Sequence, residues 1–108
     1  MDAGGFEITV EQDDARVRLR LAGELDLARA AQLEEALSTA RATATQVEID
    51  LSGLTFIDSS GLRALMNIHN DASDDGFSYI LIAGPPEVHR TFVLTGLDRV
   101  LHFADVAA

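Results

Sequence analysis

The stretch VEIDLSGLTFIDSSGL at residues 47–62 decides the fold of this chain. Apolar side chains occupy every second position of its first half: Val47, Ile49 and Leu51. This alternation predicts a strand, and the apolar run from Leu54 to Ile57 carries it forward to the polar segment 58–61. A helical spacing of apolar residues begins directly afterwards. The stretch therefore predicts a strand that passes straight into a helix.

Upstream of this stretch the sequence predicts a β-hairpin and then a helix. Apolar residues alternate with polar ones in two runs: Phe6, Ile8 and Val10, then Val17, Leu19 and Leu21. Asp13-Asp14 lies between the runs and suits a turn, so we expect a hairpin with one buried and one solvated face. Asp26 follows Gly23 at a helix N-cap position. Apolar residues then recur at helical spacing: Ala30, Leu33, Leu37, Ala40 and Ala44.

Downstream of it the sequence predicts two more helices and two more strands. The second helix is expected to carry one apolar face: Leu62, Leu65, Met66 and His69. Asp74-Asp75-Gly76 should end that helix, and the nearly continuous apolar run 77–82 should form a strand covered on both sides. Pro85-Pro86 is expected to open a third helix that Gly96 closes. A short last strand is expected around three apolar residues: Val100, Leu101 and Phe103.

The predicted order is strand, strand, helix, strand, helix, strand, helix, strand. Strands that alternate with helices indicate an α/β fold, with an open, mostly parallel mixed sheet, an antiparallel N-terminal hairpin at its edge and packed crossover helices. With 108 residues, 47% of them hydrophobic, the chain suits one domain over 1–108 with a core of about 6–103. Binding residues in such sheets gather beyond the carboxyl ends of the strands, which here means the segments 23–26 and 58–61.

Composition narrows the class of partner and the compartment. Eight Lys+Arg against eighteen Asp+Glu give a net charge of −10, and all eight basic residues are arginines. We therefore expect neither nucleic acid nor an anionic membrane as a partner, although acidity that only keeps the domain soluble is the plainer interpretation. The sequence has no cysteine, no apolar run that would cross a bilayer and no signal peptide pattern at Met1–Gly5. These features favour a cytoplasmic location.

Two adjacent hydroxyls, Ser59 and Ser60, occupy the predicted strand-to-helix junction. Serine is a common N-cap, and we expect Ser60 to cap the second helix. Ser59 would then project at the mouth of the junction, near backbone N–H groups that suit an anion. Phosphorylation would add roughly −1.5 to −2 charges. A docked partner would then face that charge together with Asp58, Asp26 and Glu24.

Three segments resemble one known family: GELD at 23–26, DLSGLTFIDSSGL at 50–62, and PEVHRTF at 86–92 with Gly96-Leu97 behind it. They resemble the STAS domain (sulphate transporter and anti-sigma factor antagonist), and the resemblance covers about Phe6 to Phe103. It implies a freestanding bacterial anti-sigma factor antagonist, which is a binding protein rather than an enzyme, needs no cofactor and is a monomer by default.

The resemblance also implies a phosphorylation switch. The unmodified antagonist would bind an anti-sigma factor that is also a serine kinase. That kinase would phosphorylate Ser59 and end the binding, and a phosphatase acting on phospho-Ser59 would reset the switch. The implied recognition surface contains seven residues: Glu24, Asp26, Asp58, Ser59, Ser60, Gly61 and Arg63. Arg63 stands where many relatives have a small residue, and it would tune the partner or hold the phosphate within the chain.

Two alternative functions stay open. STAS-like single domains also serve as accessory subunits of lipid-transporting ATPases, or in stress-signalling assemblies without a phospho-switch. The second alternative is an enzyme with a catalytic serine. The spacing Gly-x-Ser-x-Gly is absent, however, and no histidine lies near Ser59 in sequence. No histidine pair has metal-ligand spacing, so we expect no metal site.

Single residues keep alternative interpretations as well. Asp26 would be a helix cap, a recognition residue or both, and Glu24 would be a solvated turn residue or a contact. His69 would be a partly buried core residue. The row Arg16, Arg18 and Arg20 would form a solvated strand face or, alternatively, a basic patch for an acidic partner.

Overall fold

The computed structural model describes residues 5–104. Most of the segment Met1–Gly5, in which we found no signal peptide pattern, lies outside the described residues. The outer limits of the predicted domain lie outside them as well. The elements are β1 (Phe6–Asp13), β2 (Arg16–Leu25), α1 (Leu27–Arg41), β3 (Gln46–Ile57), α2 (Ser59–Asp75), β4 (Ser78–Ile82), α3 (Pro86–Thr95) and a 3₁₀ turn, η1 (Leu97–Arg99). Among the helices described there, none is long and apolar enough to span a bilayer.

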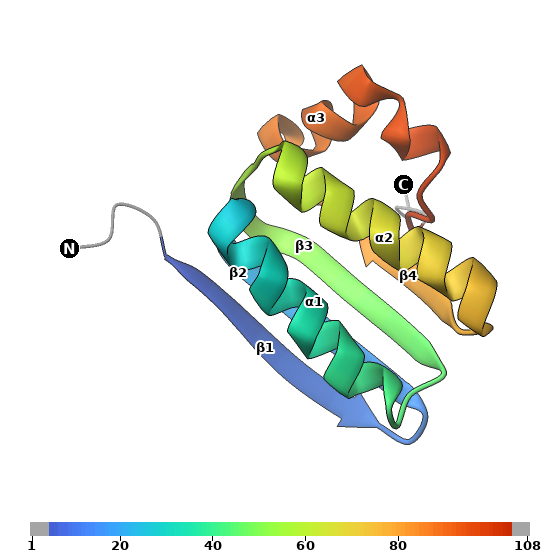
Figure 1. Cartoon of the computed structure of the whole chain (residues 1–108). Helices are drawn as coiled ribbons and strands as arrows, with labels where there is room; N and C mark the ends of the chain where they lie inside the picture. The colour runs from blue at the N-terminus through green and yellow to red at the C-terminus, as the bar shows by residue number, and fades with distance from the viewer. Residues whose placement is uncertain (1–4, 105–108) are drawn as a thin grey trace.

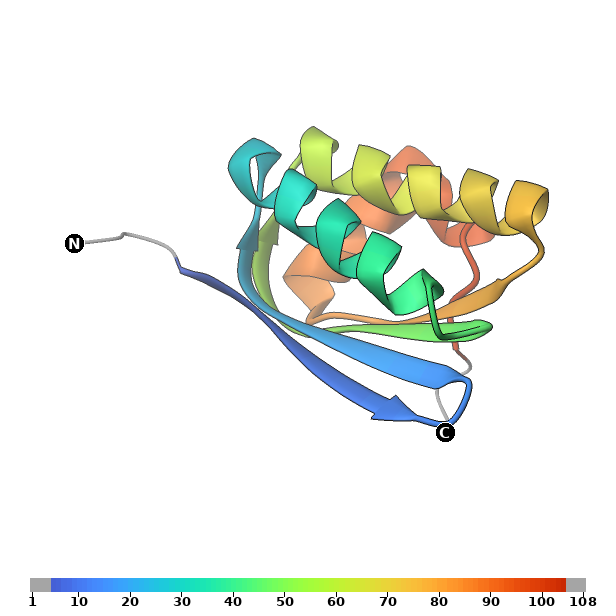
Figure 2. The same ribbon diagram turned by 60° about the horizontal axis from the view of Figure 1, so that its bottom comes forward.

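One mixed sheet organises the chain. Its strand order is β1-β2-β3-β4, with β1 antiparallel to β2 and the other neighbours parallel. The strand order advances in one direction and crossovers share one handedness, so both crossover helices fall on the same face of the sheet. Figures 1 and 2 show α1 and α2 side by side on that face, with α2 between α1 and α3. The predicted fold class is confirmed.

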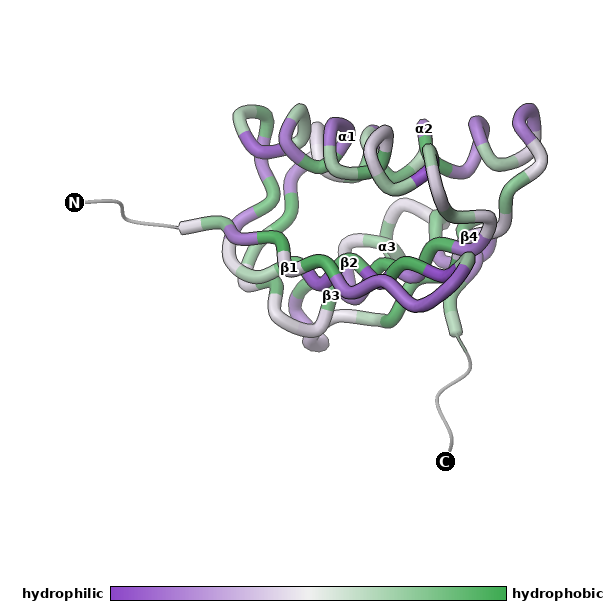
Figure 3. The backbone as a smooth tube through the Cα atoms, turned by 90° about the horizontal axis from the view of Figure 1, so that it is seen from below, coloured by the Kyte–Doolittle hydropathy of each residue, from purple (hydrophilic) through white to green (hydrophobic). Residues whose placement is uncertain are grey.

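The core lies between the sheet and these helices. Hydrophobic and hydrophilic residues alternate along the strands (Figure 3), as the sequence pattern predicts. The central strands bury these side chains: Val17, Leu19 and Leu21 of β2, and Val47, Ile49 and Leu51 of β3. The predicted helix ends are confirmed, because Gly76 and Gly96 take the left-handed conformation after α2 and α3, and α3 begins at Pro86.

The buried face of α2 is wider than the predicted stripe. It comprises Gly61, Leu62, Ala64, Leu65 and Ile68, while Met66 and His69 are only partly buried. The physical reason is that α2 packs against α1 as well as the sheet. Side chains that face α1 are therefore buried in addition to those that face the strands.

Two predictions at the β4 edge are wrong. β4 is not covered on both sides: Tyr79 and Leu81 are buried, but Ile80 between them is 38% exposed, because both crossover helices lie on the other face. The expected last strand is reduced to a bridge between Leu81 and Phe103. The backbone N–H groups of Val100 and Leu101 donate to Leu97 within the 3₁₀ turn, which leaves only the following residues to reach β4.

The opposite face of the sheet carries the arginine row of β2. Arg16, Arg18 and Arg20 are exposed and lie in register with polar residues of β3: Gln46, Glu48 and Asp50. Each arginine contacts its partner across the two strands. Because two of the three partners are carboxylates, the row is largely neutralised. This favours the solvated strand face over the basic patch.

Candidate functional site

The two segments expected to be loops are each reduced to one residue. β2 continues to Leu25 and β3 to Ile57, and these two residues are partners in the parallel register. Asp26 and Asp58 follow them, and a helix begins at the very next residue in each case. The backbone N–H of Asp58 donates to the carbonyl of Leu25 at 3.3 Å. Two helix N-termini therefore lie on neighbouring strands.

The N-cap of α2 is Asp58, so the prediction that Ser60 caps this helix is wrong. The Asp58 Oδ1 atom accepts the backbone N–H of Ser60 at 2.9 Å and that of Gly61 at 3.1 Å. A carboxylate at this position reaches the same donors as a serine, and its charge interacts favourably with the positive end of the helix dipole. Ser59 and Ser60 are consequently the first two residues of the helix.

The Ser59 side chain is exposed, whereas Ser60 is half-buried. A modifying enzyme therefore has access to Ser59. The N–H groups expected to receive an anion are, however, already occupied. Those of Ser60 and Gly61 bond to the Asp58 carboxylate, and that of Leu62 donates to the Asp58 carbonyl at 3.0 Å. A phosphate on Ser59 would find a carboxylate where free donors were predicted.

Asp26 caps α1, as predicted. Its Oδ1 atom accepts the Arg29 backbone N–H at 3.2 Å, and Oδ2 pairs with the Arg29 guanidinium at 2.8 Å. Glu24 lies in strand β2 opposite Phe56 rather than in a turn, and it is half-buried. Recognition roles for Asp26 and Glu24 stay predictions.

Gly61 has a packing role that the sequence did not reveal. The residue is buried, and a Cβ atom there would lie 2.7 Å from Ile57 Cγ1 and 2.9 Å from Leu25 Cγ. The first turn of α2 therefore rests directly on the ends of β2 and β3. This close approach holds Ser59 at a fixed place beside α1, while the predicted contact of Gly61 with a partner stays a prediction.

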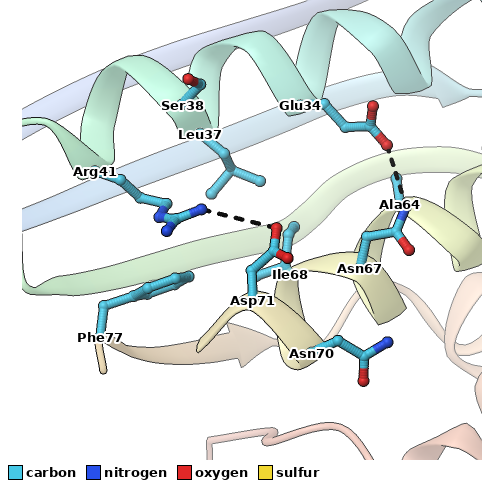
Figure 4. Close-up of a pocket in the computed structure, with 10 residues that line it drawn as sticks. All are labelled: Glu34, Leu37, Ser38, Arg41, Ala64, Asn67, Ile68, Asn70, Asp71 and Phe77. Atoms are coloured by element: carbon cyan, nitrogen blue, oxygen red, sulfur yellow. Dashed lines mark hydrogen bonds and ion pairs between the residues drawn. The ribbon is translucent and has the colours of Figure 1, made fainter. Parts of the chain in front are cut away.

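Ser59 opens into a groove between α1 and α2. The groove encloses about 260 Å³ and is lined by Leu27, Ala30, Ala31, Glu34, Ser59, Ser60, Arg63 and Ala64. Glu34 and Ala64 also line a second hollow of about 430 Å³ farther along the same two helices (Figure 4). Because the two hollows share these lining residues, they are adjacent, and we refer to them together as the channel along the helix pair.

The far half of the channel is held by internal contacts. Arg41 pairs with Asp71 at 3.7 Å and lies over the ring of Phe77, 4.3 Å from its centroid. Asn67 donates to Glu34 at 3.4 Å, and Figure 4 shows both polar contacts crossing from α2 to α1. The half beside Ser59 differs, because Arg63 makes no hydrogen bond or ion pair with any residue between 5 and 104.

Two exposed apolar side chains stand at the same end of the sheet, and sequence reasoning missed both. Leu27 begins α1 and is 74% exposed, and Phe56 near the end of β3 is 48% exposed. The signal for Phe56 was available: successive strand residues point to opposite faces, so Phe56 points away from the face on which Ile57 is buried. Leu27, which lines the groove of Ser59, is placed to contact a protein docked there, whereas Phe56 does not line that groove.

The histidines lie elsewhere in the fold. His69 Nδ1 lies 2.7 Å from the Tyr79 hydroxyl, and the His102 ring stacks on Tyr79 with centroids 4.9 Å apart. His89 packs edge-on against Phe103. None of the three lines the Ser59 groove, so that groove offers no histidine base to Ser59. Within residues 5–104, no cluster of three or more His, Asp or Glu side chains is arranged to hold a metal.

Comparison with known proteins agrees with this geometry. Residues 8–102 match the family model described as Mlab, STAS domain. The anti-sigma-B factor antagonist of Staphylococcus aureus is 24% identical over 98 residues, which cover 90% of this chain and 91% of that protein.

Solved structures share the same fold. An anti-sigma factor antagonist from Mycobacterium paratuberculosis superposes with a TM-score of 0.82 at 26% identity, covering 94% of this chain and 87% of that one. The antagonist SpoIIAA gives a TM-score of 0.75 at 26% identity in its unphosphorylated form, covering 92% and 89%. The phosphorylated form of the Bacillus protein gives 0.69 at 25% identity, covering 92% of each chain.

Proposed function

This chain belongs to the STAS domain family, and on that basis we propose that it is an anti-sigma factor antagonist controlled at Ser59. The unmodified protein, a monomer, binds an anti-sigma factor that is also a serine kinase. The kinase transfers the γ-phosphoryl group of ATP to the Ser59 hydroxyl oxygen, which releases ADP and the hydroxyl proton. The phosphorylated protein no longer binds, and a phosphatase hydrolyses the phosphoserine to restore it.

The observation that supports this proposal is the exposed Ser59 hydroxyl at the mouth of a groove that is also lined by the exposed side chain of Leu27. Apolar side chains in such positions gain free energy when a partner covers them. A phosphate in the middle of that contact must lose its hydration, and desolvating a charge without compensating donors is costly. A loss of about 3 kcal/mol would weaken binding roughly a hundredfold.

The local charge reinforces the effect. Asp26 and Asp58 are the N-caps of α1 and α2, and Glu24 of β2 lies opposite Phe56 of β3 in the sheet. A partner suited to this surface carries basic groups, which bring the kinase and the hydroxyl together. Because Asp58 already bonds to the first N–H groups of α2, those groups cannot neutralise a new phosphate. The added charge therefore acts on the interface.

The experiment uses Ser59→Ala as bait in a lysate of the source organism, because this variant should trap the kinase. The captured anti-sigma factor, purified and given ATP, should place one phosphate on the wild-type protein at Ser59, as read by mass spectrometry. Ser59→Asp should bind that kinase poorly, and the matched variant Ser73→Ala, at an exposed serine of α2 outside the groove, should bind like wild type. A phosphate on Ser60 would overturn the choice of residue.

The same bait separates this proposal from a constitutive accessory subunit. If Ser59→Ala and Ser59→Asp both retained a membrane ATPase equally, and neither retained an anti-sigma factor, the chain would be a permanent subunit without a phospho-switch. The two bait variants differ only at residue 59, where one carries a methyl group and the other a carboxylate. Their comparison therefore tests whether binding is switched at all.

A further inference from the structure

We propose that Arg63 changes partners when Ser59 is phosphorylated: its guanidinium, offered to the docked protein in the unmodified state, is captured by the phosphate as an intramolecular ion pair. This inference rests on the proposed function, because it concerns the modified state of that site. It turns the single phosphate into two simultaneous changes of the docking surface, namely an anion gained and a cation withdrawn.

The position of Arg63 allows its guanidinium to donate to a phosphate on Ser59. It lies four residues after Ser59 in α2, and residues at that spacing are neighbours on a helix surface, with Cβ atoms roughly 5–6 Å apart. Both side chains line the same groove. Both are also exposed, so neither must break a buried contact to meet the other.

The Arg63 guanidinium is available. Five other arginines are engaged by partners within residues 5–104: Arg16, Arg18, Arg20, Arg29 and Arg41. Arg90 and Arg99, like Arg63, make no hydrogen bond or ion pair there, but neither lines the groove of Ser59. Arg63 is thus the free cation of the described chain that shares a groove with the modified residue.

The phosphate needs such a donor because α2 supplies few of its own. The N–H groups of Ser60 and Gly61 are bonded to the Asp58 carboxylate. A guanidinium presents five N–H donors in a planar fork that matches two phosphate oxygens. The acidic residue that shares the groove with Arg63 is Glu34 on α1, which accepts from Asn67. A phosphate carries more charge than this carboxylate.

The consequence for the docked protein follows from the same pair. A carboxylate of the partner placed against Arg63 would meet, after modification, a cation already neutralised and a phosphate beside it. Like charges brought together in an interface repel each other and suppress binding. The switch therefore works without any refolding of α2.

The test needs neither the kinase nor the partner. Phosphoserine is installed at position 59 during translation, and ³¹P NMR follows the second ionisation of the phosphate between about pH 4 and 8. In the protein with Arg63 its pKa should lie lower by about 0.3 units or more than in Arg63→Gln, the size expected of an exposed i,i+4 ion pair. Arg63→Lys should retain part of the shift, and Arg90→Gln should leave it unchanged.

A second readout is the Nε–H resonance of Arg63, which should move on phosphorylation and follow the same titration. Equal phosphate pKa values with and without Arg63, together with a stationary Nε–H signal, would overturn the inference. Partner binding is measured separately. If phosphorylation abolished binding in Arg63→Gln as completely as in wild type and the titrations were also equal, the inference would fail while the proposed function stood.

Discussion

The Asp58 Oδ1 atom accepts the backbone N–H of Gly61 at 3.1 Å, and this contact sets the division of roles within the segment 58–61. Asp58 holds the first turn of α2, and Gly61 lets that turn rest on the ends of β2 and β3. Neither serine hydroxyl is needed for the cap. The exposed one, Ser59, is therefore free to be modified without loosening the helix.

Replacing Asp58 should destabilise the fold, while replacing Ser60 should not. Asp58→Ala removes the acceptor of two backbone N–H groups, and loss of an N-cap costs about 1 kcal/mol. Ser60→Ala is the control, since its hydroxyl is not the cap. Urea unfolding of both variants measures the difference in their free energies of unfolding. A larger destabilisation by Ser60→Ala would show that Ser60, and not Asp58, is the N-cap.

Gly61→Ala should destabilise the protein although alanine is the better helix former. Alanine is favoured over glycine by about 1 kcal/mol within a helix. Here its methyl group would lie 2.7 Å from Ile57 Cγ1, and overpacking of this kind costs about 1–3 kcal/mol. Thermal unfolding shows directly whether the substitution lowers or raises the melting temperature. A raised melting temperature would mean that the strand ends yield and that the glycine is dispensable.

The sequence predicted the first halves of β2 and β3 well because apolar residues alternate with polar ones there, and Leu19 and Ile49 are both buried as that period predicts. The prediction from sequence failed where one local pattern of residues is compatible with two different structures. Asp58 and Ser60 are both good N-caps, and only the continuation of β3 to Ile57 decides between them. Leu27 fits the helical period of α1, yet it is exposed because that helix begins beyond the edge of the core.

The Tyr79 hydroxyl should anchor the C-terminal segment. It accepts the backbone N–H of His102 at 3.0 Å and is hydrogen-bonded to His69 Nδ1 at 2.7 Å. Tyr79→Phe leaves both groups without their partner, and a lost partner of this kind costs about 1–3 kcal/mol. Urea unfolding should show that loss, and hydrogen exchange of the His102 amide should accelerate. An unchanged exchange rate would contradict the role of the hydroxyl.

Asp50 should contribute stability that is lost in acid. Burial of its carboxylate disfavours the charged form, but the hydrogen bonds from Ser52 and the Arg20 guanidinium outweigh burial and lower the pKa of Asp50 below its ordinary 3.8. A carboxyl with a lowered pKa in the folded state stabilises the fold above its unfolded pKa, and this stability disappears as the pH falls through the folded value.

Asp50→Asn should therefore reduce the free energy of unfolding near pH 6, and its deficit against wild type should shrink as the pH falls below about 3.8. Asp74→Asn is the matched control, because Asp74 is exposed and the described residues offer it no hydrogen bond or ion pair. Urea unfolding at several pH values measures the curves. A deficit that stayed constant with pH would exclude the carboxylate charge as its cause.

The final prediction separates docking from folding by means of two leucines with equal exposure. Leu27 at the start of α1 and Leu94 in α3 are each 74% exposed, so alanine at either position should change the free energy of unfolding by less than about 0.5 kcal/mol. They differ in location, because Leu27 lines the groove of Ser59 and Leu94 does not. Burying a leucine side chain in an interface is worth about 1.5–3 kcal/mol. Leu27→Ala should therefore weaken binding of the unphosphorylated protein to its anti-sigma factor by about tenfold or more, whereas Leu94→Ala should bind like wild type in the same calorimetric titration. Equal losses in the two variants would show that the docked protein covers α3 as well, and a loss confined to Leu94→Ala would move the interface away from Ser59.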